Sequence, residues 1–241
     1  MFFDVVPICK AQLLDVNPND LLNEGLYRKC NTYKGGGGYD KFPEIYNRRF
    51  HTNRDDLNNQ FVVQVRGCPL SCPYCYVTKD GVNGGFVKVS SEQLVNDFKS
   101  SNCSVFHLMG GAPALHLRKW PDLLNHLDGA VFHSDFLCLE GVYDKAVLSE
   151  IAEYKQSLYA VSVKGGTVEE FERNTATKFN ESLFESNLEK LVECKIPFYI
   201  TFTGMTPETI EAFKNKHTGI DFSDSFAIDL VHYNALDYKE N

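Results

Sequence analysis

The sequence contains no apolar stretch long enough to cross a membrane, and its first residues, MFFDVVPICKAQ, lack the basic start and long apolar core of a signal peptide. It also has no excess of positive charge, since 24 Lys and Arg stand against 32 Asp and Glu, giving a formal net charge of −8. A broad phosphate-binding face needs basic residues, so this balance argues against general nucleic-acid binding. We expect a cytoplasmic protein with no membrane partner.

Internal repeats and coiled-coil heptads are absent as well. With 241 residues, of which 43% are hydrophobic, the chain suits one domain that builds its core without disulfides. In the cytosol its eight cysteines are then thiols or metal ligands. Three of them lie within eight residues of one another, and five are scattered, namely Cys9, Cys30, Cys103, Cys138 and Cys194.

Residues 1–60 show no regular pattern and are expected to form an irregular N-terminal extension, a candidate lid over the substrate. They include a run of four glycines at 35–38, which does not suit the interior of a helix or strand. This run is either a plain surface loop, or a mobile lid or backbone contact for phosphate groups. No Gly-Lys-Ser/Thr follows it, which argues against the phosphate interpretation.

From residue 60 onward, short apolar runs alternate with segments of helical periodicity. This alternation predicts an α/β fold whose parallel strands are joined by right-handed crossovers, arranged as an open doubly wound sheet or as a partial barrel. The predicted strands are residues 61–65, 104–109, 130–133, 158–163, 198–202 and 225–232, and the predicted helices are 91–100, 117–127, 143–154, 181–194 and 207–216.

Glycine and polar residues gather at the ends of these strands. Ligands bind at the carboxyl ends of the strands in both kinds of fold, so we expect the active site there. Within the elements, His107 is expected to be structural, Trp120 to serve packing, and Cys103, Cys138 and Cys194 to be small buried hydrophobic residues. The strand-end residues are Gly110, Gly111, Ala112, Pro113, Ser134, Asp135, Ser162, Lys164, Thr201, Thr203, His232, Tyr233 and Asn234.

Cys68, Cys72 and Cys75 form a C-x₃-C-x₂-C motif within the segment GCPLSCPYCY. Three thiolates at this spacing can hold three corners of a cubane iron–sulfur cluster, and no fourth cysteine lies nearby, so one iron would stay open to an outside ligand. Three other interpretations compete with this one. They are a structural zinc site, a thiol-redox motif made of Cys72 and Cys75 alone, and three buried structural thiols.

The motif resembles that of the radical S-adenosylmethionine (SAM) superfamily, which has an aromatic residue at the place of Tyr74. The resemblance implies a [4Fe–4S] cluster on the three cysteines, with its open iron chelated by the amino and carboxylate groups of SAM. In that superfamily the second strand ends in G-G-E-P, which contacts the methionyl amino group. Residues 110–113 here read G-G-A-P, so Ala112 replaces the glutamate and one side-chain contact is lost.

In overall layout, residues 60–238 look most like the small activating enzymes, such as pyruvate formate-lyase activating enzyme. The resemblance implies a partial (β/α)₆ barrel in residues 61–241. It also implies that Ser134 and Asp135 contact the ribose or carboxylate of SAM, although both residues equally suit a turn or a helix cap. Lys164 would neutralise the SAM carboxylate or a substrate anion, or would be simply solvated. The implied cofactor contacts are Tyr74, Gly110, Gly111, Ala112, Pro113, Ser134, Asp135, Ser162, Lys164, Thr201 and His232.

The resemblance implies an oxidoreductase chemistry as well. A reduced cluster, supplied by a reductant such as flavodoxin or ferredoxin, gives one electron to SAM, and the resulting 5′-deoxyadenosyl radical abstracts a hydrogen atom from the substrate. The expected substrate is a partner protein that receives a glycyl radical. The alternatives are a small molecule or nucleotide, as for 7-carboxy-7-deazaguanine synthase or a base-modifying enzyme, and, from another class, a non-catalytic iron–sulfur or zinc-binding protein.

Overall fold

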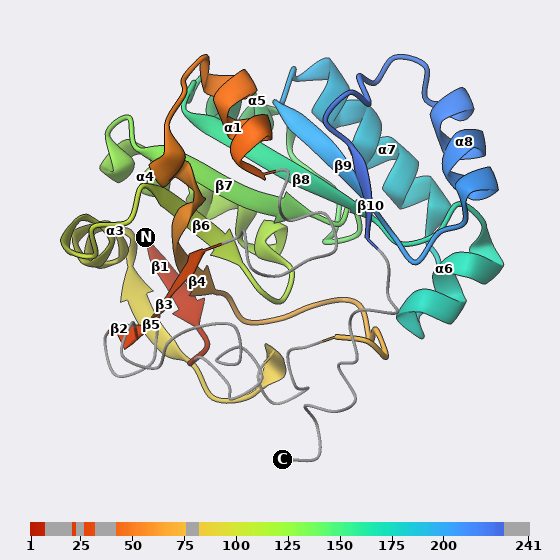
Figure 1. Ribbon diagram of the computed structural model, residues 1–241. Helices are drawn as coiled ribbons and strands as arrows, with labels where there is room; N and C mark the ends of the chain where they lie inside the picture. The colour runs from red at the N-terminus through yellow and green to blue at the C-terminus, as the bar shows by residue number, and fades with distance from the viewer. Residues whose placement is uncertain (8–20, 23–26, 32–41, 76–81, 229–241) are drawn as a thin grey trace.

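The computed structural model describes residues 1–7, 21–22, 27–31, 42–75 and 82–228, which are dominated by one large sheet (Figure 1). This sheet has eight strands in the order β10-β9-β8-β7-β6-β4-β3-β2. The six strands from β10 to β4 are parallel, and β3 and β2 extend the edge in antiparallel pairing. The strands are β2 Leu21–Leu22, β3 Tyr27–Asn31, β4 Asn59–Gln64, β6 Val105–Met109, β7 Val131–Phe136, β8 Ser157–Val163, β9 Phe198–Thr203 and β10 Phe226–Ile228.

Helices alternate with the parallel strands and pack on the outer face of the sheet (Figure 1). Their starts follow from local sequence, since Ser90, Asn180 and Thr206 accept backbone N–H groups at the first turns of three of them. The helices are α3 Ser91–Ser100, α4 Trp120–Leu127, α5 Lys145–Ala152, α6 Val168–Thr175, α7 Glu181–Glu193 and α8 Pro207–Lys216, and the 3₁₀ helix η7, Pro113–Lys119, precedes α4.

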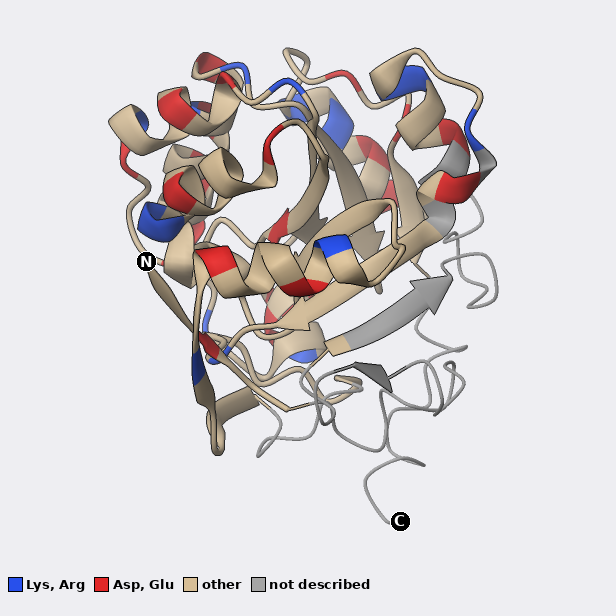
Figure 2. Cartoon of the chain, turned by 90° about the vertical axis from the view of Figure 1, so that its left-hand side faces the viewer, with Lys and Arg blue, Asp and Glu red and all other residues tan. Residues whose placement is uncertain are grey.

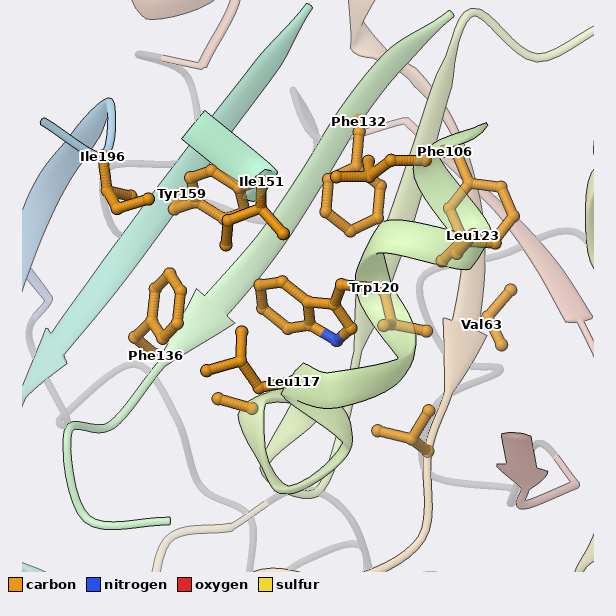
Figure 3. Close-up of a cluster of buried hydrophobic side chains, with 14 of the residues drawn as sticks. Val63, Phe106, Leu117, Trp120, Leu123, Phe132, Phe136, Ile151, Tyr159 and Ile196 are labelled. Atoms are coloured by element: carbon orange, nitrogen blue, oxygen red, sulfur yellow. The ribbon is translucent and has the colours of Figure 1, made fainter. Parts of the chain in front are cut away.

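The outer core centres on Trp120, which is fully buried between α4 and the sheet (Figure 3). Its ring stacks on Tyr159, with centroids 5.7 Å apart and planes 4° from parallel, and it meets Phe132 edge-on. Large aromatic side chains carry much of the apolar area buried in a core, so these contacts fix α4 against β7 and β8. The packing role predicted for Trp120 is confirmed.

The inner face of the sheet is closed at one end by helix α1, Phe42–Phe50. Ile45 and Tyr46 of α1 are buried in a cluster with Val105, Val131 and Leu158. The last three residues lie in the first or second position of β6, β7 and β8, so α1 covers the amino ends of these strands. The carboxyl half of the inner face stays available for a site.

The α/β class and the six parallel strands of a partial barrel are confirmed, and helices 91–100 and 207–216 have the predicted bounds. Strand β7 continues to Phe136, three residues beyond its prediction. Residues 35–38 and the tail of the last predicted strand, with His232, Tyr233 and Asn234, lie outside the described residues.

The first sixty residues contribute regular elements that the sequence analysis does not predict. Strand β3 reads YRKCN and has no apolar run, whereas helix α1 reads FPEIYNRRF and has apolar residues at positions 42, 45, 46 and 50, which is the spacing of one helix face. Strand β1, Phe2–Val5, pairs antiparallel with β5, Val87–Ser90, in a second small sheet. Only non-local pairing stabilises such short strands, which is why the N-terminal extension is less irregular than expected.

Charges of both signs are interspersed on the helices visible in Figure 2. Several form exposed ion pairs, such as Lys216 with Glu185, where the two charged atoms are 2.7 Å apart. Pairs of this kind contribute little to stability because water and salt screen them. Within the described ranges, no helix has the length and apolar character needed to cross a bilayer.

Candidate active site at the carboxyl ends of the strands

A cavity lies on the inner face of the sheet, at the carboxyl ends of the parallel strands. Alternate residues of a strand point to the same face, and the residues lining the cavity follow this rule. The strands contribute His107 and Met109 from β6, His133 and Asp135 from β7, Ala160 and Ser162 from β8, and Tyr199, Thr201 and Thr203 from β9. Ile228 of β10 lines the cavity too, which therefore collects side chains from five neighbouring strands.

Cys68, Cys72 and Cys75 all line this cavity, and each is a reduced, partly buried thiol. They lie on the loop that follows β4, and backbone hydrogen bonds hold this loop at three points. Gly67 donates to Val82 O at 2.8 Å, Ser71 donates to Thr175 O at 3.1 Å, and Cys75 donates to Cys72 O at 3.1 Å. The loop thus presents its three sulfur atoms to one space.

Burial raises the pKa of the Cys68 thiol to about 11, and the neighbouring Lys164 ammonium opposes this shift more weakly. Burial and the nearby thiols also raise the pKa of Tyr74 far above its usual range, so its phenol stays neutral. A buried thiol with a raised pKa is a poor free nucleophile, because the thiolate is the reactive form. A metal that binds these sulfurs must therefore displace protons from them.

Gly110, Gly111 and Pro113 line the cavity after β6, but Ala112 does not. The side chain of Ala112 is fully buried, and its backbone N–H donates to Gly67 O at 2.7 Å. Ala112 thus ties the turn formed by Gly110 and Gly111 (the glycine turn) to the loop that carries the three cysteines (the cysteine loop). Its own side chain does not reach a ligand in this cavity. The expected cofactor contact at Ala112 can come from its backbone alone.

Asp135 lines the cavity, whereas Ser134 points to the opposite face of β7. The Ser134 hydroxyl is buried and donates to Leu108 O at 2.7 Å. Both residues are predicted at a strand end, but β7 runs to Phe136 and the strand alternation separates them. The structure therefore corrects the expectation that Ser134 contacts a cofactor, because its hydroxyl is used inside the sheet.

Lys164, Ser162 and Thr201 lie together on the cavity wall. The Lys164 ammonium is 5.5 Å from the centroid of the Tyr74 ring, and the Ser162 and Thr201 hydroxyl oxygens are 3.2 Å apart. The ring face attracts the ammonium and so holds it beside the cysteine loop. This part of the wall offers one positive charge and two hydroxyls to a polar ligand.

The pattern of the sequence does not reveal the two histidines of the cavity. It predicts a structural role for His107 and none for His133, yet both line the cavity from adjacent strands. Burial lowers the pKa of His133 well below its usual range, so its imidazole is neutral. A polar residue at the same position of two neighbouring apolar strands, FHL and FHS, is the signal that points to them.

The donor set of the loop fits a [4Fe–4S] cluster. Thiolates are the ligands of such clusters, and among the described residues no further cysteine lines this cavity. Three sulfur ligands leave one iron without a protein ligand, so a small molecule with amino and carboxylate groups can bind it. Lys164 places a positive charge on the wall of the same cavity.

The family model of the radical SAM superfamily matches residues 62–216, well over half of the chain. No curated protein matches the chain. Solved structures share its fold at low sequence identity. They include a histidine-tagged anSMEcpe with bound AdoMet (SAM), with a TM-score of 0.52 and 19% identity over 68% of this chain and 47% of that one. Another is HydG, the FeFe-hydrogenase maturase of Carboxydothermus hydrogenoformans, with a TM-score of 0.51 and 13% identity over 68% and 42% of the two chains.

A third is SuiB of Streptococcus suis bound to its precursor peptide SuiA, with a TM-score of 0.50 and 12% identity over 65% of this chain and 35% of that one. The match spans less than half the length of each of these three structures. Their likeness supports the fold, and the family model supplies the assignment. The cofactors of the family are a [4Fe–4S] cluster and SAM. The chain belongs to the radical SAM superfamily.

Proposed function

We propose that this protein is a radical SAM enzyme whose [4Fe–4S] cluster is held by Cys68, Cys72 and Cys75. The observation that carries the proposal is the convergence of three reduced thiols on the cavity that Gly110, Gly111 and Lys164 also line. When bound, the cluster and SAM supply a reductive cleavage that gives methionine and a 5′-deoxyadenosyl radical, which abstracts a hydrogen atom from the substrate.

The other residues of the cavity would hold and orient SAM. Lys164 is the positive charge available to the SAM carboxylate, and the backbone of Gly110 and Gly111 lies beside the cysteine loop for its amino group. Ser162 and Thr201 offer hydroxyls to the ribose. Asp135 also faces the cavity from β7, beside His107.

For the substrate, we propose a protein or peptide that receives a radical, as for the activating enzymes. The structural likeness to SuiB bound to a precursor peptide agrees with a peptide substrate. A small molecule or nucleotide is the second candidate, because buried polar side chains, His107 and His133, line the cavity where only a compact group would reach them. The electron donor would be a small redox protein such as a flavodoxin or ferredoxin.

The test is to reconstitute the cluster without oxygen, reduce it, and record the EPR spectrum before and after adding SAM. An open iron predicts that SAM changes the spectrum, and that added reductant yields 5′-deoxyadenosine in a stoichiometric or larger amount. S-adenosylhomocysteine, which has no sulfonium, is the matched control and should give no 5′-deoxyadenosine. A protein that holds zinc, or whose cluster spectrum ignores SAM, is a non-catalytic metal protein, and the proposal is then wrong.

Replacing Lys164 with glutamine is expected to weaken SAM binding about tenfold, or about 1.4 kcal/mol. The substitution removes the positive charge that lies over the Tyr74 ring beside the cysteine loop. SAM titration of the cluster EPR signal measures the change. Lys164→Arg keeps the charge and should retain most of the affinity, and the exposed Lys178→Gln should behave as the wild type. Equal affinities of Lys164→Gln and wild type would show that this ammonium does not bind SAM.

A further inference from the structure

Three metal-ligating side chains, His107, His133 and Asp135, meet in the cavity away from the cysteine loop. One ligand atom from each lies within 4.8 Å of the others. The parallel register places His107 directly beside His133, so their rings face each other with centroids 4.2 Å apart and planes tilted by 34°. Asp135 follows two residues later on the same face of β7. Two imidazoles and one carboxylate are thus close enough together to share one metal ion.

His107 has a free nitrogen directed into this cluster. Its Nδ1 lies 2.6 Å from Gln60 Oε1, and an amide oxygen only accepts, so Nδ1 carries the proton and Nε2 keeps its lone pair. His107 is only 5% exposed, yet its Nε2 has no hydrogen-bond partner among the described residues. The carboxylate oxygen Asp135 Oδ2 is 3.8 Å from this nitrogen, which is too far for a hydrogen bond. A buried acceptor without a partner is costly unless a ligand uses it.

The Nδ1 atoms of the two histidines are hydrogen-bonded to Gln60 and Tyr46, and these two residues are bonded to each other. Gln60 accepts from His107 and donates from Nε2 to the Tyr46 hydroxyl at 2.9 Å, and that hydroxyl lies 2.9 Å from His133 Nδ1. Histidines that bind metals almost always use their second nitrogen in this way, which fixes the ring and its tautomer. Helix α1 supplies Tyr46, so an element of the N-terminal extension orients the pair.

The remaining nitrogen of His133 faces Tyr199. His133 Nε2 lies 3.1 Å from the Tyr199 hydroxyl, and both residues line the cavity. A metal ion at this place would replace that contact, and the hydroxyl would then face the ligands of the metal. Both imidazoles are held through Nδ1, so Nε2 is the nitrogen that each has for a metal ion.

We propose that His107, His133 and Asp135 form a 2-His-1-carboxylate site for a divalent transition metal ion, separate from the cysteine loop but in the same cavity. Two imidazoles and a carboxylate form a known donor set for such ions and leave coordination positions open. Those positions face the cavity, so an oxygen or nitrogen of the substrate can bind there. The site goes beyond the proposed SAM chemistry and depends on neither SAM nor its cleavage.

Mn²⁺ is the probe for this site, added to the reconstituted protein while its cluster is in the oxidised, EPR-silent state. Free Mn²⁺ gives a strong EPR signal that falls as the ion binds. We expect one bound Mn²⁺ per chain and its displacement by Zn²⁺, which binds such sites more tightly. Asp135→Asn keeps the shape of the side chain and should weaken binding by more than about a hundredfold, and Tyr46→Phe, which removes an outer hydrogen bond, by about tenfold.

The control is His126→Asn, which removes an exposed histidine from α4 and should bind Mn²⁺ as the wild type does. Circular dichroism verifies that each variant is folded. A wild-type protein that binds no Mn²⁺, or an Asp135→Asn protein with wild-type affinity, overturns the metal site. The same samples, once reduced, report the SAM-dependent change of the cluster signal. Mn²⁺ binding therefore tests the metal site, and the response of the cluster to SAM tests the proposed enzyme function, in the same samples.

Discussion

Replacing Cys72 with serine is expected to remove the [4Fe–4S] cluster and to lower SAM cleavage by more than about a hundredfold. Loss of an outer hydrogen bond to a metal ligand already costs ten- to a hundredfold in affinity or activity, so loss of a ligand itself costs more. Cys72 lies between the other two ligands on the loop, and all three line one cavity. Iron content, the cluster EPR signal and the yield of 5′-deoxyadenosine measure the effect.

Cys194→Ser is the matched control for this variant. Cys194 follows α7, and its sulfur lies 3.8 Å from the Ser149 hydroxyl, away from the residues that line the cavity. It should bind iron and cleave SAM as the wild type does. A Cys72→Ser protein with wild-type iron and an unchanged response to SAM would show that Cys72 is no ligand. Loss of iron in both variants would indicate a general loss of folding.

Most of the parallel core is predictable because a buried strand must be apolar along its length. The run FVVQ in β4 and the run VFHLM in β6 each read as a strand without knowledge of their neighbours. Helix α6, VEEFERNT, is different, since it has two acidic residues in its first turn and few apolar ones. Its stability comes from Phe171 packing onto the rest of the molecule, which is information that a short window of sequence does not carry.

In the candidate site, too, some residues are predictable from the sequence and others are not. The three cysteines lie within one short segment, so their spacing alone predicts their role. The partners of His107 are distant in sequence, since Gln60 lies 47 residues away. The prediction misplaces Ser134 because it ends the strand three residues early, and one position decides which face of a strand a side chain occupies. Chemistry carried by one loop is readable from sequence, and chemistry built across strands is not.

Both the sequence motif and the structure explain why residue 111, in the turn after β6, is a glycine. The resemblance to the superfamily motif indicates a cofactor role for Gly111, but its backbone also meets the cysteine loop directly. Gly111 has φ +58°, and a Cβ placed on it would lie 2.4 Å from Gly67 O and 2.6 Å from Val65 O. Gly67 immediately precedes Cys68. The close approach of these two backbones therefore sets the position of the first cysteine.

Gly111→Ala is accordingly expected to lower the free energy of unfolding by about 3 kcal/mol. About 1–2 kcal/mol comes from an L-residue in the left-handed region, and the rest from forcing the two backbones apart. The displacement would also break the hydrogen bond from Ala112 N–H to Gly67 O. Iron content after reconstitution should fall with stability, because the loop that carries the thiols moves. Urea denaturation and iron analysis measure the two effects.

Substitutions at two other glycines separate the two causes of the lost stability, which are the left-handed backbone conformation and the steric clash. Gly129 has φ +82°, but a Cβ placed on it would meet no atom within 4 Å, so Gly129→Ala tests the backbone conformation alone and should cost about 1 kcal/mol. Gly85 has neither a positive φ nor a neighbour within 4 Å, so Gly85→Ala should be neutral or slightly stabilising. If Gly111→Ala were no less stable than Gly129→Ala, the cysteine loop would move away from the new methyl group at no cost. The close approach of the two backbones would then not set the position of Cys68.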